Sequence, residues 1–486
     1  MVWIIEGVQE SMKRIASFVM LLVLLASALA ACGAATPATS TAPSTAAGGT
    51  QASVAASVAA ATTAASAAAS PSAAATTETM ATATTDTTAT TTAGTDGTAV
   101  AGTDGTAVAE ENLPDVSALN LSGIRIGYQG PLSGPQAQFG TTGLNGAQLA
   151  VEQLGEQMGF QGVEIAQFDD QATETVGASN ANTIAADQNI MCVVGHINSG
   201  VALAALPTYR DANLVMISPA NTNPRVTEEF DGTAYRLVGR DDVQGVVAAD
   251  FAVNELQAKN AYVLHDQTAY GEGLATVFRD TLEERGVTVA GFAGTQEQSV
   301  FDAVLTPIQA ANPDVIFFGG IYSTVGPFIQ QLRERGIEAT VLGGDGLDSP
   351  DLTRLAGETA VGTNYVSVSG PASAYPQAAQ FSEDYQSQFN APAGYPAFQA
   401  YDAAKACLLA IANAATEANG KPTREQVEAA MEDVDTFQGV TGTVTFDEEG
   451  DRSPATYYVF EVVSGDPENW GQNTVAGTVE AEPPAE

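Results

Sequence analysis

The sequence predicts an α/β protein made of two doubly wound lobes, each with a parallel β-sheet covered by helices on both faces. The strands expected at residues 191–195 and 214–217 are apolar on both faces, which favours parallel strands buried between two layers of helices. Such strands alternate with amphipathic helices, one of which carries Leu144 and Val151 on a single face. The alternation restarts near Asn260, so the sequence indicates two successive α/β units.

The other predicted elements follow the same pattern along the chain. Strands are expected at 124–128, 163–168, 191–195 and 214–217 in the first unit and at 260–265, 288–292, 314–319 and 340–343 in the second, with helices between them. A strand near 362–368 is followed by helices at about 374–389, 397–418 and 423–433 and by strands at 441–446 and 457–463. The folded part is therefore expected to cover residues 113–466.

The N-terminus has the features of an export signal. Lys13 and Arg14 precede an apolar run over 15–31, which is short for a membrane span and ends in small residues. The tetrapeptide Leu29-Ala30-Ala31-Cys32 looks like a bacterial lipobox, and this resemblance implies removal of residues 1–31 and lipidation of Cys32. Met12 opens such a signal more naturally than Met1 does, and an ordinary signal peptide without lipidation stays an alternative.

Two segments outside the folded part have compositions that favour disorder. Residues 32–112 begin with Cys32 and continue almost entirely in Ala, Thr, Ser and Gly, which bury too little apolar surface to offset the entropy of ordering. We expect this segment to be a flexible tether to the membrane. Residues 467–486 are rich in Pro, Glu and Gly and are predicted to form a disordered acidic tail.

Charge and cysteine content exclude several classes of function. The 486-residue chain has a formal net charge of −40, which argues against nucleic-acid binding and against a basic membrane-binding surface. Cys192 and Cys407 are expected to be free buried thiols, with a disulfide as the alternative. The sequence has no cluster of cysteine and histidine for zinc, and no metal or cofactor is expected. His196 and His265 are expected to be hydrogen-bonded structural residues.

Polar loops follow the predicted strands in both units. Ser199 lies in the loop after the strand at 191–195, and residues 218–222 follow the next strand. Residues 265–266 and 343–346 hold equivalent places in the second unit. At the carboxyl ends of parallel strands such loops meet helix N-termini, whose free N–H groups favour anions. We therefore expect a ligand-binding cleft between the two units.

Several motifs occur in order along these loops. They are Pro131-Leu132-Ser133-Gly134-Pro135 with Ala137-Gln138-Phe139-Gly140, Val194-Gly195-His196, Ser218-Pro219-Ala220-Asn221-Thr222, His265-Asp266 with Tyr270-Gly271-Glu272-Gly273, and Thr445-Phe446-Asp447-Glu448-Glu449-Gly450-Asp451. In this order and spacing, over about residues 123–465, they resemble the leucine/isoleucine/valine-binding proteins of branched-chain amino-acid importers. The resemblance implies the type I periplasmic-binding fold, with two lobes joined by three hinge strands.

The resemblance also implies how the lobes divide the chain. Lobe 1 would comprise about residues 123–239 plus 369–446, and lobe 2 about 240–368 plus 447–466. The ligand would bind between the lobes and favour their closed arrangement. A membrane permease with ATPase subunits of an ABC importer would be the partner of a monomeric, extracytoplasmic protein anchored by its lipidated cysteine.

The same resemblance places a ligand carboxylate in lobe 1. The hydroxyls of Ser199 and Thr222 would hold it, together with backbone N–H groups of the Ala220-Asn221-Thr222 segment. Without the resemblance, a helix N-cap is the favoured interpretation of Ser199 and a turn residue that of Thr222.

In lobe 2 the resemblance assigns Asp345 to the ligand's ammonium group, with a cap for the helix near 350 as the alternative. Tyr270 and Phe139 match aromatic positions near the ligand, although either could be ordinary packing. Ile321 stands where branched-chain amino-acid binders of the family have tyrosine, and Asp345 where they have glutamate. The class of ligand, a branched-chain or related amino acid, is therefore better supported than its identity.

Two other functions are compatible with parts of the sequence. A ligand-sensing module for an amide, urea or aromatic compound, acting through a separate receptor chain, would use the same two-lobed fold. A hydrolase on a doubly wound fold would need a Gly-x-Ser-x-Gly nucleophile elbow, which this sequence does not contain. We therefore expect a transport protein and not an enzyme.

Overall fold

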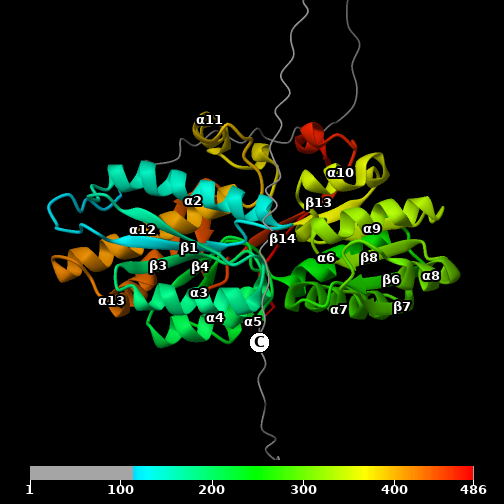
Figure 1. Cartoon of the computed structure of the whole chain (residues 1–486), viewed down its shortest axis with the longest axis horizontal. Helices are drawn as coiled ribbons and strands as arrows, with labels where there is room; N and C mark the ends of the chain where they lie inside the picture. Colours follow the sequence, from blue (N-terminus) through cyan, green and yellow to red (C-terminus); the bar gives the residue numbers. More distant parts are fainter. Residues whose placement is uncertain (1–112, 485–486) are drawn as a thin grey trace, which may run out of the picture. The chain divides into compact units, whose positions relative to one another are not determined.

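The computed structural model describes residues 113–484, which belong to one compact unit with two large β-sheets (Figure 1). The predicted signal peptide, Cys32 and the tether up to residue 112 lie outside the described residues, as do residues 485 and 486. Of the helices between residues 113 and 484, none is both long enough and apolar enough to cross a membrane.

The first sheet has five parallel strands in the order β2-β1-β3-β4-β5. They are β1 (Arg125–Gly130), β2 (Glu164–Asp169), β3 (Ile190–Gly195), β4 (Met216–Ser218) and β5 (Ala234–Arg236). β3 is buried at every residue, as expected for a central strand with helices on both faces.

Helices cover both faces of this sheet (Figure 1). They are α2 (Ala137–Gln157), α3 (Glu174–Ala186), α4 (Ser199–Asp211), α5 (Arg225–Glu228), α11 (Ala378–Phe389), α12 (Ala397–Ala418) and α13 (Arg424–Ala429), the last continued by the 3₁₀ helix η4 (Ala430–Val434). α2 packs on α12, and α3 packs on α4. α12 has 18 buried residues out of 22, many of them alanine. The small side chains let α2 approach closely, and a Cβ atom at Gly146 of α2 would collide with the carbonyl oxygen of Ala397.

The second sheet has seven strands in the order β14-β13-β10-β9-β8-β6-β7. They are β6 (Asn260–His265), β7 (Thr288–Gly294), β8 (Val315–Gly319), β9 (Thr340–Gly343), β10 (Asn364–Ser367), β13 (Ala455–Glu461) and β14 (Thr474–Ala481). The five strands from β6 to β10 are parallel and repeat the 2-1-3-4-5 order of the first sheet. Two antiparallel strands, β13 and β14, extend it. The predicted α/β fold with two doubly wound parallel sheets is confirmed.

The helices of the second sheet also lie on both of its faces (Figure 1). They are α6 (Asp241–Asn254), α7 (Ala269–Glu284), α8 (Asp302–Ala311), α9 (Tyr322–Glu334) and α10 (Asp351–Ala356), with the 3₁₀ helices η1 (Asp345–Leu347) and η2 (Gly357–Ala360). The 3₁₀ helix η3 (Ala372–Ala374) lies in the connection after β10 and packs on α11. α6 packs on α7, and α9 packs on α10.

The chain passes between the two sheets three times. It leaves the first sheet after β5, returns after β10, and leaves again after the small antiparallel pair β11 (Thr436–Gly439) and β12 (Gly442–Thr445). The lobe limits predicted near residues 239, 368 and 446 fall in these three connections. Three connections of this kind are the covalent links across which two lobes can move by hinge bending.

The prediction of a disordered tail from residue 467 is wrong. Pro467–Gln472 form the 3₁₀ helix η5, and β14 pairs along its whole length with β13. Trp470 anchors the segment, because its ring stacks on Tyr365 at a centroid distance of 5.5 Å and its Nε1–H donates to Asp348 Oδ1 at 3.2 Å. β14 is an edge strand with six exposed residues of eight, so its sequence lacks the apolar pattern that would have predicted it.

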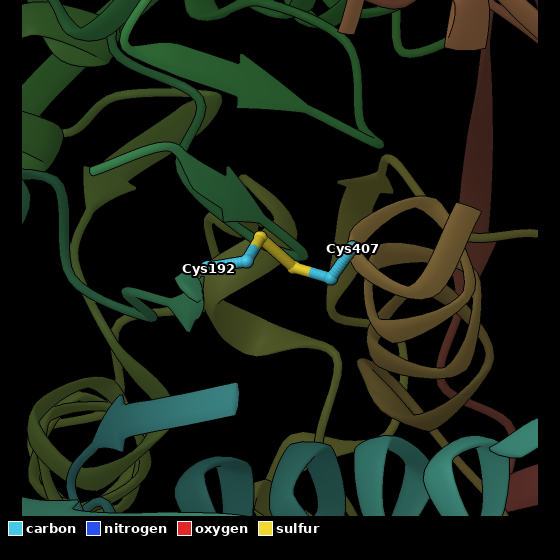
Figure 2. The surroundings of a disulfide bond; sticks show 2 residues. All are labelled: Cys192 and Cys407. Atoms are coloured by element: carbon cyan, nitrogen blue, oxygen red, sulfur yellow. A yellow bond between two sulfur atoms is a disulfide. The ribbon is translucent and has the colours of Figure 1, made fainter. Parts of the chain in front are cut away.

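The expectation of two free thiols is also wrong. Cys192 of β3 and Cys407 of α12 form a disulfide with a Cα–Cα distance of 5.8 Å (Figure 2). The two cysteines lie 215 residues apart, and no spacing rule connects them. The packing of α12 on β3 brings them together. Disulfides persist in oxidising compartments, so this bond suits an exported protein.

We expect the disulfide to contribute substantially to stability, because it constrains a very long loop of the unfolded chain. The double variant Cys192→Ala/Cys407→Ala should lose about 2–5 kcal/mol of unfolding free energy, measured by denaturant unfolding. A reductant should move the transition of the wild type toward that of the variant and leave the variant unchanged. Equal stability of the two oxidised proteins would contradict this expectation.

Candidate ligand-binding site

A cavity lies where the carboxyl ends of the strands of both sheets meet. Its wall is formed by residues that follow β1, β2, β3 and β4 of the first sheet and β6, β8 and β9 of the second, together with Tyr395 just before α12. This is the place at which doubly wound sheets bind ligands, since strand-end loops and helix N-termini converge there.

Six of the eight predicted ligand residues line this cavity. They are Phe139, Ser199, Ala220, Tyr270, Ile321 and Asp345. The other two, Asn221 and Thr222, are buried behind the wall and not on it. Asn221 supports the loop after β3, because its Nδ2 donates to the carbonyl of Ile197 at 3.0 Å and its Oδ1 accepts from the N–H of His196 at 3.3 Å.

The N-terminus of α4 forms one end of the cavity. Ser199, Gly200 and Val201 line it with the first turn of the helix, which contains no acidic residue. The N–H groups of a first turn have no partner within their helix, and the helix dipole adds positive potential there. The hydroxyl oxygen of Ser199 accepts from the N–H of Asn223 at 3.4 Å, which leaves the hydroxyl hydrogen for an anionic ligand. This end is suited to a carboxylate.

Asp345 forms the opposite end, from the second sheet. Its side chain is buried, with a residue exposure of 4 %. Oδ1 accepts from Tyr270 Oη at 2.9 Å and from Gln244 Nε2 at 3.1 Å, and Oδ2 accepts from Tyr395 Oη at 3.1 Å. All three bonds are made with side chains of other segments, whereas a helix cap would accept from a backbone N–H of α10. Asp345 is therefore not the cap of α10, which was the alternative expected from the sequence.

No basic side chain among the described residues pairs with the negative charge of Asp345. Burial raises the pKa of its carboxyl group, and its three neutral hydrogen-bond donors oppose that rise. Asp241, at the start of α6, is 1 % exposed, and burial and the Asp345 charge raise its pKa well above its usual value. A cation placed beside Asp345 would therefore be strongly stabilised.

An aromatic wall closes the space between the two ends. The Phe139 ring meets those of Tyr322 and Tyr395 edge to face, at centroid distances of 4.9 and 5.6 Å. Ile321 lines the cavity, whereas Tyr322 extends past it and donates its hydroxyl hydrogen to the carbonyl of Pro135 at 3.1 Å. Ile321 thus supplies an aliphatic part of the wall, and Tyr322 links the two sides of the cleft.

Sequence reasoning missed several residues of the wall, namely Gln136, Glu174, Asn198, Thr268 and Tyr395. Gln136, Asn198 and Thr268 lie within three residues of motifs that were recognised, so strand-end position could have indicated them. Tyr395 gave no such signal, because it precedes a helix that belongs to the first sheet and reaches the cavity only through the tertiary fold.

The whole folded part resembles known proteins. A family model described as "Periplasmic binding protein" matches residues 123–467. The chain belongs to this family. The resemblance to the leucine/isoleucine/valine-binding proteins is confirmed.

Individual relatives agree with this assignment. An "Amino acid binding protein" of Pseudomonas aeruginosa is 31 % identical over 350 residues, which cover 70 % of this chain and 90 % of the relative. "Leu/Ile/Val-binding protein homolog 2" of Brucella abortus is 31 % identical and covers 71 % of this chain and 91 % of its own. The isoleucine complex of LivJ from Streptococcus pneumoniae superposes with a TM-score of 0.65 at 25 % identity, over 74 % of this chain and 99 % of LivJ.

Because the pKa of Asp345 is raised, ligand affinity should depend on pH. An ammonium group favours the ionised carboxylate, so binding should release protons and weaken as pH falls through the raised pKa. The groups around this carboxyl are Gln244, Tyr270, Tyr395 and the acids Asp241 and Asp348, so the titration belongs to the cluster.

Calorimetric titrations with L-isoleucine and L-threonine, from about pH 7 to about pH 4.5 in buffers of different ionisation enthalpy, measure both the affinity and the protons released. Affinity that stays constant over this range, with no proton release, would contradict the assignment of Asp345 to a cation.

Proposed function

We propose that this binding protein captures an α-amino acid between its two lobes and delivers it to the permease of an ABC importer. One cavity is lined both by the first turn of α4, which favours an anion, and by the buried Asp345, which has no cationic partner among the described residues. This combination of an anion-binding and a cation-binding group carries the proposal. A ligand with a carboxylate and an ammonium group satisfies both ends at once.

The two ends belong to different sheets, which gives the ligand a way to control closure. Ser199 begins a helix of the first sheet, and Asp345 follows a strand of the second. A zwitterion that bridges them binds the closed arrangement better than an open one, and only this difference in affinity can shift the equilibrium. The closed form would then be what the permease recognises.

The relatives support an amino acid over other solutes. Their names describe amino-acid or Leu/Ile/Val binding, and LivJ holds isoleucine. A neutral amide or urea would leave both ends of the cavity without a charged partner, and an aromatic carboxylate would leave the Asp345 end without one. Binding of acetamide, urea or benzoate in preference to all neutral amino acids would favour that alternative.

The charge of Asp345 is the sharpest test. Asp345→Asn keeps the shape of the side chain and should weaken amino-acid binding at least tenfold at neutral pH, because a charge-assisted bond contributes about 1.5–3 kcal/mol. Ser199→Ala should weaken it by a smaller factor, through the loss of one hydroxyl donor. Isothermal titration calorimetry of the full-length protein with a panel of neutral L-amino acids gives the dissociation constants.

Asp348→Asn is the matched control for this test. Asp348 lies three residues further on and also accepts hydrogen bonds from neutral side chains, those of Ser367 and Trp470, but it does not line the cavity. Because it removes a charge that lies further from the cavity, its replacement should change affinity at neutral pH far less than Asp345→Asn does. If Asp345→Asn and Asp348→Asn weaken binding equally, the effect is a general disturbance of this region and the ammonium role of Asp345 is wrong.

We also propose that the protein is held at the outer face of the cell membrane by acyl chains on Cys32. The proposal rests on the lipobox-like tetrapeptide that ends at Cys32. One acyl chain gives only marginal binding, whereas several on one cysteine give stable anchoring. Cys32→Ser should therefore release the protein into the soluble fraction, as measured by ultracentrifugal fractionation and immunoblotting. A variant that stays in the membrane fraction like the wild type would refute the anchor.

A further inference from the structure

Asn223 makes a hydrogen bond across the cleft. It lies in the segment between β4 and α5 of the first sheet, directly after Thr222. Its Nδ2 donates to the carbonyl oxygen of Ala269 at 2.8 Å, and Ala269 is the first residue of α7, which packs on strands of the second sheet. Asn223 does not line the ligand cavity, so this bond joins the two sides of the cleft beside the ligand and not through it.

The partners of the Asn223 amide fix its orientation. Its Oδ1 accepts from the N–H of Arg225 at 3.2 Å, while its Nδ2 faces the carbonyl oxygen of Ala269. A carbonyl oxygen only accepts and a backbone N–H only donates, so exchanging the two ends of the amide would lose both bonds. The contact with α7 is close, because a Cβ atom at Gly273 of that helix would lie 3.1 Å from Asn223 Nδ2. The amide is therefore seated firmly on the first turn of α7.

The same residue is linked to both ends of the ligand cavity. The backbone N–H of Asn223 donates to the hydroxyl oxygen of Ser199, at the end suited to a carboxylate. On the other side of the cleft, Ala269 is followed by Tyr270, whose hydroxyl donates to Asp345 at the opposite end. Asn223 thus connects the helix N-terminus that favours an anion with the helix that supports the buried carboxylate.

A buried arginine holds the segment that carries Asn223. Arg236 Nη1 donates to the carbonyl oxygens of Asn221 at 3.0 Å and of Asn223 at 2.9 Å. The Arg236 guanidinium is fully buried and forms an ion pair with Asp451, which lies in the third connection between the two sheets. Charge-assisted bonds of this kind are strong and fix the backbone to which they are made. Asn223 can therefore lose its contact with Ala269 only if α7 moves away, that is, if the cleft opens.

We propose that Asn223 is a positioning residue that keeps the cleft closed over its ligand through the bond to Ala269. The inference rests on the proposed capture of an amino acid between the lobes. A bond made only in the closed form stabilises that form and leaves the open form, to which the ligand first binds, unchanged. Its loss should therefore speed ligand release without slowing association. An asparagine that only shaped the local turn through its Oδ1 would not depend on the amide nitrogen.

The variant Asn223→Ser separates these two roles. Serine can still accept from the N–H of Arg225, as hydroxyls do in such turns, but it is too short to reach Ala269. Release of L-isoleucine and of L-threonine from the full-length protein should become about two- to tenfold faster, the effect of one neutral hydrogen bond. Because Asn223 does not line the cavity, the factor should be the same for both ligands. Chase of the radiolabelled amino acids gives the release rates, and calorimetry gives the dissociation constants from which association rates follow.

Asn180→Ser is the matched control. Asn180 Nδ2 also donates to a backbone carbonyl at 2.8 Å, that of Asp169, but both residues belong to the first sheet and its helices, so this bond does not cross the cleft. Its loss should leave the release rate unchanged. Unchanged release in Asn223→Ser, slower association in place of faster release, or an equal effect in Asn180→Ser would overturn the role of Asn223 and leave amino-acid binding by the wild type intact. A wild-type protein that binds no amino acid would refute the proposed function, and the role of Asn223 with it.

Discussion

The buried carboxylate of Asp345 is the constraint on which the organisation of the cleft depends. Its hydrogen-bond donors come from α6, from α7 and from the segment before α12, so three separate parts of the chain must converge to hold one charge. These donors are neutral and orient the carboxylate without cancelling its charge. The fold thus keeps a negative potential in place, opposite the positive end of the α4 dipole.

Direct contacts between the two sides of the cleft accompany this arrangement. Tyr322 donates to the carbonyl of Pro135, and Ser349 Oγ donates to Gln138 Oε1 at 3.0 Å. Tyr395 belongs to the chain segment that enters the first sheet's helices, yet its hydroxyl donates to Asp345 beside the second sheet. The bonds of Tyr322 and Ser349 join neutral groups and contribute modestly to closure, whereas the bond of Tyr395 is made to a carboxylate and is stronger.

Much of the fold follows from local sequence, and the exceptions have physical causes. Most strands were predictable because they are short and bounded by helical periodicity, but the short strands β5 and β11 were not among those expected. The location of the cavity was predictable too, because strand-end loops must meet at one edge of a parallel sheet, and the family resemblance selected Ser199 and Asp345 among the residues of its wall. β14 could not be predicted, because this exposed edge strand is held by main-chain bonds to β13 and by Trp470, and its sequence has no apolar pattern. Tyr395 and the Cys192–Cys407 bond depend on how distant segments pack, which spacing along the chain does not encode.

The disulfide has a consequence for the order of events during export. Cys407 follows Cys192 by 215 residues, and five of the seven strands of the second sheet, β6 to β10, are encoded between them. A chain that crosses the membrane from its N-terminus exposes the Cys192 thiol well before its correct partner emerges. The sequence contains three cysteines in all, so the one competitor for that thiol is Cys32. Acylation of the Cys32 sulfur, as proposed, would remove this competitor, and anchoring chemistry at one end of the protein would then also protect the pairing of its core.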